Sequence, residues 1–388
     1  MSIDCPLQPN GEVKQFGSLS FTPLDNFVKS FQFSPDGSLC LTGDERANAY
    51  VTQVDQATVS KYRYYNLGSD STGGASNNSA LSAVHTTIPI GEAIYDMKWH
   101  PASDATNCCF ASTSRDHPII LWDVDNTSNA ANVRCTYRGY DHNDELDSAI
   151  SMSFNLSGDK LYAGSNRMIR CFDVISPGKD CFAIPTSATR KSAYGQKGLI
   201  STIAFNPDYS GAYAAGSFAE SVGIYVENTS ECALLLNNLG FGVTHVRWSP
   251  CGKYLWTGGR NNNTILCWDI RSTQSIVGSV ERQLNSNQRM TFDIDPWGKY
   301  LCTGTQDGKV LFFDTNTFEL SRTIETNDIL NVDNKIKKTS QSMCVNSVSF
   351  HPFSALLGVA IGERSFAMNA DADETDETAE LQCQNKES

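Results

Sequence analysis

The sequence lacks the long apolar runs and the catalytic motifs that would assign it to a membrane or to a familiar class of enzyme. Nowhere do about eighteen consecutive apolar residues occur, and residues 1–10 show no basic region followed by an apolar stretch, so neither membrane spanning nor secretion is predicted. There is no Gly-x-Ser-x-Gly turn and no phosphate-binding glycine loop. The six histidines show no metal-ligand spacing. We therefore expect no catalytic residue, no metal and no cofactor.

Cysteine is present without the pattern of a disulfide framework. The thirteen cysteines are odd in number and scattered, and several fall inside predicted strands, where a reduced thiol behaves as a small apolar side chain. A reducing compartment is therefore predicted.

Positive charge is scarce, and negative charge is unevenly placed. The net charge is −13, which by itself argues against a nucleic-acid partner. Residues 367–388 hold seven acids and one lysine, so about half of the excess lies in this tail. Because the tail has almost no apolar content, it is predicted to be disordered.

What the sequence does contain is a repeat. An aromatic residue, a small polar residue, a proline and a turn recur, with some variation, in seven copies that begin at Phe33, Trp99, Phe154, Phe205, Trp248, Ile294 and Phe350. Most copies close some twenty residues later on an aromatic residue and aspartate, as at Trp122-Asp123 and Trp268-Asp269. A period of roughly 40 to 45 residues ending in Trp-Asp is typical of a four-stranded propeller blade. The predicted fold is therefore an all-β, seven-bladed WD40 β-propeller.

The repeat also predicts how the chain is divided. Residues 26–366 form the propeller, with flexible insertions near 68–78 and 326–341. Residues 1–25 are expected to supply a strand that closes the ring, and residues 367–388 are the acidic tail.

Antiparallel strands place two kinds of loop on one rim of the disc: the loop between the second and third strands of each blade, and the loop that enters the next blade. Basic and aromatic side chains recur in these loops, as a surface for single-stranded or looped RNA would require. They are Arg46, Arg115, Arg167, Arg260, Lys309, Lys197 and Arg289, with Tyr140, His142 and Phe241.

The same rim carries acidic residues, so topology alone favours a protein-binding face over an RNA-binding one. Two arginines are not explained as neighbours of the usual loop aspartate of a propeller blade. That aspartate is absent from Ser165-Asn166-Arg167 and from Gly259-Arg260-Asn261. The acidic residues of this rim are Asp44, Glu45, Asp116, Asp141, Asp144, Glu145 and Glu220.

Several segments in the rim loops and inter-blade connections carry a family resemblance. Residues 112–119, 140–146, 177–181, 198–205 and 287–296 are similar to the telomerase Cajal body protein family, WD-repeat proteins that bind small Cajal body RNAs and telomerase RNA. With the other matching stretches they run from Phe27 to about Phe366 in the family's order, which is nearly the whole chain.

The resemblance implies a non-enzymatic scaffold that recognises box H/ACA small Cajal body RNAs and telomerase RNA, directs the ribonucleoprotein to Cajal bodies and supports telomerase assembly. It implies H/ACA ribonucleoprotein subunits and Cajal body proteins as partners, a nuclear location with a cytoplasmic pool, no membrane, and a monomer within a larger assembly. The RNA-binding residues that it implies are Arg115, Tyr140, His142, Arg167 and Arg289, followed by Lys179 and Arg260.

Two alternatives stay open at this point. More distant fungal relatives resemble splicing-linked proteins, so a spliceosomal or small nuclear RNA partner is one of them. The other rests on Trp268, Asp269 and Arg271, which have the Trp-Asp-x-Arg form of propellers that act as substrate receptors of cullin ubiquitin ligases, where the arginine faces the adaptor.

Overall fold

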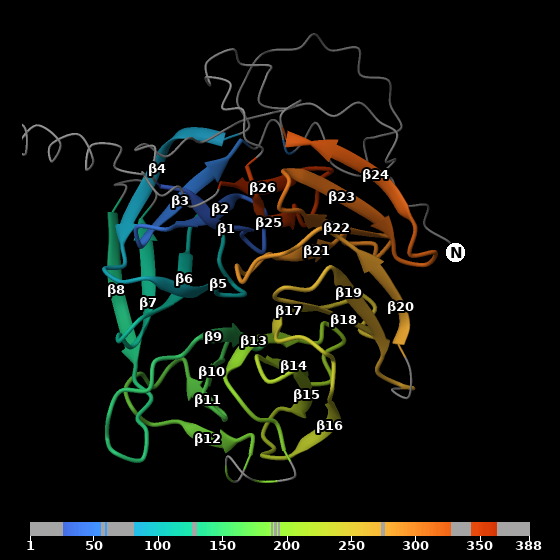
Figure 1. Ribbon diagram of the computed structural model, residues 1–388. Coiled ribbons are helices and arrows are strands. Elements are labelled where there is room, and N and C mark those ends of the chain that lie inside the picture. Colours follow the sequence, from blue (N-terminus) through green and yellow to red (C-terminus); the bar gives the residue numbers. More distant parts are fainter. Residues whose placement is uncertain are drawn as a thin grey trace, which may run out of the picture.

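The computed structural model describes residues 26–55, 59, 81–125, 130–187, 189, 192, 195–272, 276–326 and 343–362. In these residues the chain forms a ring of β-sheets around a central axis (Figure 1). None of their helices is long and apolar enough to cross a membrane. The predicted N-terminal closing strand, the insertion at 68–78, the acidic tail and all but the first residue of the insertion at 326–341 lie outside the described residues.

Six of the sheets have four antiparallel strands in chain order, and we call them blades 1 to 6. Blade 1 comprises β1 Val28–Phe33, β2 Leu39–Asp44, β3 Asn48–Val54 and β4 Leu81–Pro89; blade 2, β5 Ile94–Trp99, β6 Cys108–Ser114, β7 Ile119–Asp125 and β8 Ala130–Tyr137; blade 3, β9 Ser151–Phe154, β10 Lys160–Ser165, β11 Met168–Asp173 and β12 Phe182–Pro185. Blade 4 comprises β13 Ile200–Phe205, β14 Ala212–Ser217, β15 Ser221–Val226 and β16 Cys232–Leu236; blade 5, β17 Val243–Trp248, β18 Tyr254–Gly259, β19 Thr264–Asp269 and β20 Ile276–Glu281; blade 6, β21 Phe292–Ile294, β22 Tyr300–Gly304, β23 Lys309–Asp314 and β24 Leu320–Glu325.

The prediction of an all-β propeller is confirmed, but the prediction of seven complete blades is wrong for the described part of the chain. The seventh sheet has two strands there, β25 Val345–Phe350 and β26 Leu357–Ile361. Residues 1–25, which are expected to add an outer strand, lie outside the described residues, as do the residues after Gly362. The two strands still fill the space between blades 6 and 1: Asn346 Nδ2 donates to Val28 O at 3.0 Å, and Phe350 N donates to Asp293 Oδ2 at 2.9 Å.

The core lies between neighbouring blades because each strand alternates its side chains between two faces. Leu39 and Leu41 of blade 1 pack with Trp99 and Phe110 of blade 2 in one buried cluster. The closing tryptophans of the repeat are part of this packing, and each also satisfies its indole N–H. Trp268 Nε1, for example, donates to Thr257 Oγ1 at 3.0 Å.

Two histidines of the repeat tie neighbouring blades at the turn between first and second strands. A ring nitrogen of His100 lies 3.0 Å from Gly158 O, and one of His351 lies 3.0 Å from Gly37 O. These contacts give both histidines a structural role. His351 thereby joins the two-stranded sheet to blade 1, across the closure of the ring.

Gly37→Ala is expected to lower the free energy of unfolding by about 2–4 kcal/mol, because φ is +73° and a Cβ there would lie 2.3 Å from His351 Nε2. Gly91→Ala is the matched control, since its φ is +97° and a Cβ would meet nothing within 4 Å. The control should cost about 1 kcal/mol. Urea denaturation measures both, and equal losses would contradict the clash with His351.

Candidate nucleic-acid interface

The predicted sharing of one rim by two kinds of loop is confirmed by backbone hydrogen bonds between them. Arg115 N donates to Ala93 O at 3.2 Å, Arg167 N to Gly198 O at 2.9 Å and Arg260 N to Gly242 O at 3.0 Å. In each pair the arginine follows a second strand, and the acceptor lies in a loop that enters a blade. We call this surface, formed by the second-to-third-strand loops and the loops entering each blade, the loop rim.

Arg167 is presented on the loop rim without an evident structural task. Its backbone has φ of +55°, a conformation that asparagine or glycine adopts at lower cost than arginine. Among the described residues its guanidinium has no hydrogen-bond or ion-pair partner. Neither the turn geometry nor an internal contact therefore accounts for an arginine at this position.

Arg260 is exposed and stacks on an aromatic residue. Its guanidinium carbon lies 4.9 Å from the ring centroid of Phe218, which stands in the corresponding loop of blade 4. A guanidinium laid over an aromatic ring is a cation–π contact, and its open face can take a nucleobase. Lys309 differs, because its ammonium lies 3.0 Å from Asp307 and is already paired.

Arg115 and Arg289 converge on the same tyrosine. A side-chain hydrogen bond to Tyr95 is the main cause that raises the pKa of the exposed Arg115. Arg289 Nη1 donates to Tyr95 O at 3.2 Å, and its Nε donates to Thr244 O at 3.1 Å. Arg289 therefore corrects the sequence expectation: it reaches from blade 6 into the mouth of the central channel and does not stand on the open rim.

Tyr140 and His142 lie in the loop between blades 2 and 3, where both are exposed. The buried Arg170 holds this loop in place, because its Nη2 donates a hydrogen bond to Tyr140 O at 2.7 Å. Arg170 Nη1 also pairs with Asp147 Oδ2 at 2.6 Å. A stacking residue and an imidazole are thus presented on an anchored loop.

Lys179 is not brought together with the loop-rim arginines. It lies in the connection between β11 and β12, which leaves blade 3 at its other rim. That connection runs along β8, where Gly178 N donates to Thr136 O at 3.1 Å and Arg138 N donates to Gly178 O at 2.8 Å. Lys179 therefore follows a residue that pairs with the end of β8, where the loop that enters blade 3 begins. The sequence gives the order of these segments but not the path of the connection.

The acidic residues of the loop rim have structural tasks in several places. Asp44 accepts hydrogen bonds from Asn48 N at 2.7 Å and from the Tyr50 hydroxyl at 2.8 Å. The Asp141 carboxylate accepts from the backbone N–H groups of Asn143 and Glu145, which lower its pKa. These carboxylates hold loops in shape, so their presence does not by itself mark a protein-binding face.

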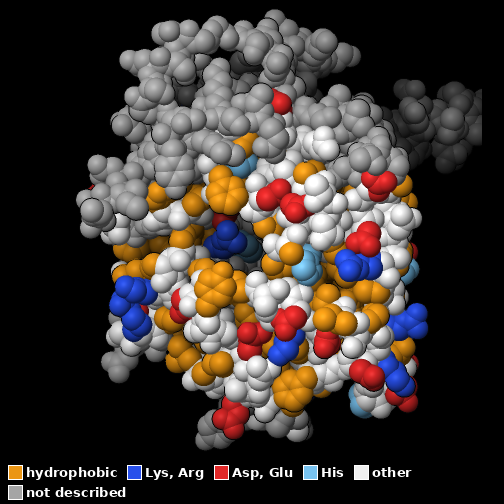
Figure 2. Space-filling model, turned by 180° about the vertical axis from the view of Figure 1, so that it is seen from behind, with side chains coloured by type: hydrophobic (Ala, Val, Ile, Leu, Met, Phe, Trp, Pro, Cys, Tyr) orange, Lys and Arg blue, Asp and Glu red, His pale blue; other side chains and the backbone are white. Residues whose placement is uncertain are grey.

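The largest feature that sequence reasoning missed is the central channel, a cavity of about 1300 Å³ lined by the first strands of the blades. Figure 2 shows a face of the disc that is hollowed at its centre, with Lys or Arg side chains in the depth of the hollow. Lys98 and Arg247 line the channel, and each directly precedes the opening tryptophan of its repeat. This position in the repeat is the sequence feature that could have identified the two residues. The residue before a core-facing aromatic points to the opposite face of the strand.

The residues of the adaptor alternative lie at the end of β19. Trp268 is buried, and Arg271 pairs with Asp269 through Nε–Oδ1 at 2.9 Å and Nη2–Oδ2 at 2.7 Å. This pair holds Arg271 on the rim opposite the loop rim. The adaptor role stays a prediction.

The described residues hold no group of three or more His, Cys, Asp or Glu side chains that could bind a metal ion. The cysteines among them are free thiols.

The fold and the repeats define this chain as a WD-repeat protein, and the WD domain, G-beta repeat family matches residues 235–269. Telomerase Cajal body protein 1 of Bos taurus is 34% identical over 367 residues, which are 93% of this chain and 62% of that protein. The Homo sapiens protein of the same name is 33% identical over 89% of this chain and 58% of that protein. The chain thus spans about three fifths of the length of these relatives.

Guanine nucleotide-binding protein negative regulator 1 of Schizosaccharomyces pombe is 30% identical over 300 residues, which are 74% of this chain and 70% of that protein. The chain belongs to the WD-repeat family of the telomerase Cajal body proteins, as its loop segments predicted.

Proposed function

We propose that this protein is a non-enzymatic RNA-binding scaffold that recognises box H/ACA small Cajal body RNAs, and telomerase RNA where the cell has one. In this proposal it directs the ribonucleoprotein to Cajal bodies, supports telomerase assembly, and works in the nucleus beside H/ACA ribonucleoprotein subunits and Cajal body proteins. The names of its relatives support an association with telomerase and Cajal body components and a location in the nucleus.

The observation that carries the RNA-binding part is the presence of loop-rim arginines that the fold itself does not use. The guanidinium of Arg167 has no hydrogen-bond or ion-pair partner among the described residues, and Arg260 offers a guanidinium plane stacked on Phe218. Cations neutralise phosphates, and flat side chains stack on unpaired bases, so the two together suit a looped RNA.

The RNA contact that we expect of each side chain follows from its position. Arg167 and Arg115 contact phosphates, because both are exposed or half-exposed on second-to-third-strand loops. Tyr140 and Arg260 stack on bases, and His142 donates a hydrogen bond to a base edge or phosphate. Arg289 lies at the inner edge of this surface, beside the opening of the central channel.

Crosslinking in cells, followed by sequencing of the attached RNA, tests the proposal. We expect enrichment of box H/ACA RNAs, with crosslinks concentrated in their loops. An unrelated propeller expressed at the same level is the control. Enrichment of messenger RNA only, of spliceosomal small nuclear RNA, or of no RNA would contradict the proposed client.

A second candidate is a protein-binding propeller that acts on a guanine nucleotide-binding protein. The Schizosaccharomyces pombe relative favours it, because its name describes such a regulator and this chain covers 70% of that protein. Absence of crosslinked RNA together with co-purification of a GTP-binding protein would select this candidate over the first.

A further inference from the structure

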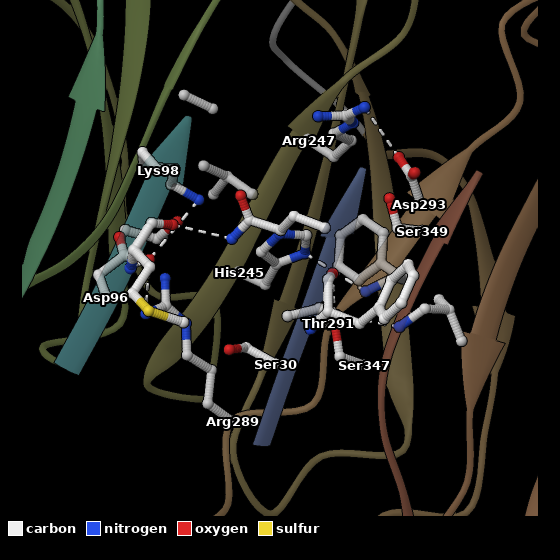
Figure 3. Close-up of a pocket in the computed structure, with 18 of the residues that line it drawn as sticks. Ser30, Asp96, Lys98, His245, Arg247, Arg289, Thr291, Asp293, Ser347 and Ser349 are labelled. Atoms are coloured by element: carbon white, nitrogen blue, oxygen red, sulfur yellow. Dashed lines mark hydrogen bonds and ion pairs between the residues drawn. The ribbon is translucent and has the colours of Figure 1, made fainter. Parts of the chain in front are cut away.

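The central channel gathers cations from three separate blades. Lys98 comes from β5, Arg247 from β17 and Arg289 from the loop that enters blade 6. Figure 3 shows Lys98, Asp96 and Arg289 grouped on one side and Arg247 with Asp293 on the other, with His245 between them. Such a gathering of charge inside a ring is costly unless a counter-charge is present.

The two carboxylates of this group are already used by the ring. Asp96 accepts from Met97 N at 3.0 Å and, across the blade boundary, from Met152 N at 3.1 Å. Asp293 accepts from Ile294 N at 2.9 Å and, across the next boundary, from Phe350 N at 2.9 Å. Both carboxylates therefore tie neighbouring blades together.

The carboxylates only partly neutralise the cations. Arg247 Nη2 lies 2.9 Å from Asp293 Oδ1, a close pair. Lys98 Nζ at 3.6 Å and Arg289 Nη1 at 3.8 Å share the single oxygen Asp96 Oδ1, and neither contact is short enough for a hydrogen bond. Three cations thus face two carboxylates. Asp44 and Glu45 border the cavity elsewhere, where Glu45 pairs with Lys29.

Burial is the main cause of the pKa shifts of two channel residues, and neighbouring cations add to it. Burial is the main cause that lowers the pKa of Lys98, and Asp96 opposes it, while Arg289 and Arg247 add to the lowering. The pKa of His245 is well below its usual range, first through burial and then through Arg289, Lys98, Arg247 and Arg282.

Arg282 is a further cation that acts on His245 but does not line the cavity. It is buried and has no carboxylate partner among the described residues; its Nη1 donates to Thr303 Oγ1 at 2.8 Å. The cluster of Lys98, Arg247 and Arg289 therefore holds one positive charge more than its two carboxylates, and Arg282 adds another beside it. Over the whole lining of the cavity, four basic side chains match four acidic ones in number.

We propose that the central channel binds a small phosphorylated ligand, whose phosphate groups lie among Lys98, Arg247 and Arg289. Hydroxyl groups along the wall, such as those of Thr291 and Ser347, can serve the rest of a polyol or sugar phosphate. The cavity of about 1300 Å³ is large enough for such a ligand. Neither Arg167 nor Arg260 lines the cavity, although Arg260 stacks on Phe218, which does.

Inositol hexakisphosphate is a suitable probe, because it presents clustered phosphates on a small polyol. It should raise the melting temperature of the wild-type protein by several degrees and bind with one-to-one stoichiometry in calorimetry. Lys98→Met and Arg247→Gln should each weaken binding by about tenfold or more, since each removes one charge-assisted contact. Lys253→Met, which removes an exposed lysine at a turn outside the channel, is the matched control and should bind as wild type.

The unliganded protein gives a second readout. Lys98→Met should not lower the melting temperature in the absence of probe, because it removes a desolvated ammonium and keeps the volume of the side chain. A lysine that merely stabilises the ring would give the opposite result, a loss of stability without any change in binding.

A short RNA with a 5′-triphosphate, compared with the same RNA ending in a 5′-hydroxyl, distinguishes the source of the phosphates. A preference for the triphosphate end that is lost in Lys98→Met and Arg247→Gln would assign the channel to an RNA end. Equal binding of the probe by wild type, both channel variants and the control would overturn the proposal, as would no binding at all. A loop-rim variant at Arg167, which does not line the cavity, leaves this site intact, so failure of the channel proposal and failure of the RNA-binding proposal are distinguishable.

Discussion

Reversal of both free-standing loop-rim charges, Arg167→Glu together with Arg260→Glu, is expected to weaken RNA binding by about 100-fold at physiological salt. Each change removes a cation from the proposed phosphate path and adds an anion that repels the RNA. The free energy of unfolding should fall by under about 1 kcal/mol, because surface substitutions cost little and the main loss is the contact of Arg260 with Phe218. Filter binding or fluorescence anisotropy with a box H/ACA loop measures the affinity.

The dependence on salt separates an electrostatic contact from a change in fold. The logarithm of the binding constant falls with the logarithm of salt by about 0.7 for each phosphate contacted in a single strand, so the double variant should show a slope shallower by about 1.4. The matched control reverses two lysines on the opposite rim, Lys160→Glu with Lys253→Glu, at turns between first and second strands. Superimposed titrations of wild type and the loop-rim variant would show that this rim is not the RNA site.

The parts of this surface that the sequence predicted are those that topology alone determines. In a propeller the order of strands fixes which loops share a rim, so the sequence places Arg115, Arg167 and Arg260 on the same rim, as the structure does. His100 and His351 occupy the same slot of the repeat, between the opening aromatic and the proline, and in the structure each contacts a turn of the neighbouring blade.

The parts that the sequence did not predict depend on the path and direction of individual side chains. Arg289 lies in a rim loop, yet its side chain turns into the channel because Tyr95 O, Thr244 O and Asp96 provide acceptors there. Lys179 follows a connection that runs along the outer strand of the neighbouring blade.

The channel itself was missed for a related reason. Its residues come from first strands of different blades, and only closure of the ring brings Lys98 within reach of Arg289. A single repeat gives no sign of this convergence.

Asp147→Ala is expected to be the most destabilising change near the loop rim, with a loss of about 3–5 kcal/mol in the free energy of unfolding. Arg170 is 6% exposed, and its Nη1 is held by Asp147 Oδ2 at 2.6 Å and Ser165 Oγ at 2.9 Å. Without the carboxylate, a buried guanidinium remains without a counter-charge. Glu145→Ala, in the same loop but exposed, is the matched control and should cost under about 0.5 kcal/mol.

The double variant Asp147→Ala/Arg170→Met distinguishes an uncompensated charge from a lost contact. Because it removes both charges, it should recover much of the stability that Asp147→Ala loses, as replacement of buried ion pairs by apolar side chains does elsewhere. It should not recover RNA affinity if Tyr140 contacts RNA, because Arg170 Nη2 no longer holds Tyr140 O and the loop loses its anchor. Recovery of both stability and RNA affinity would show that Tyr140 and His142 do not contact RNA. The loop-rim arginines would then remain as the binding surface.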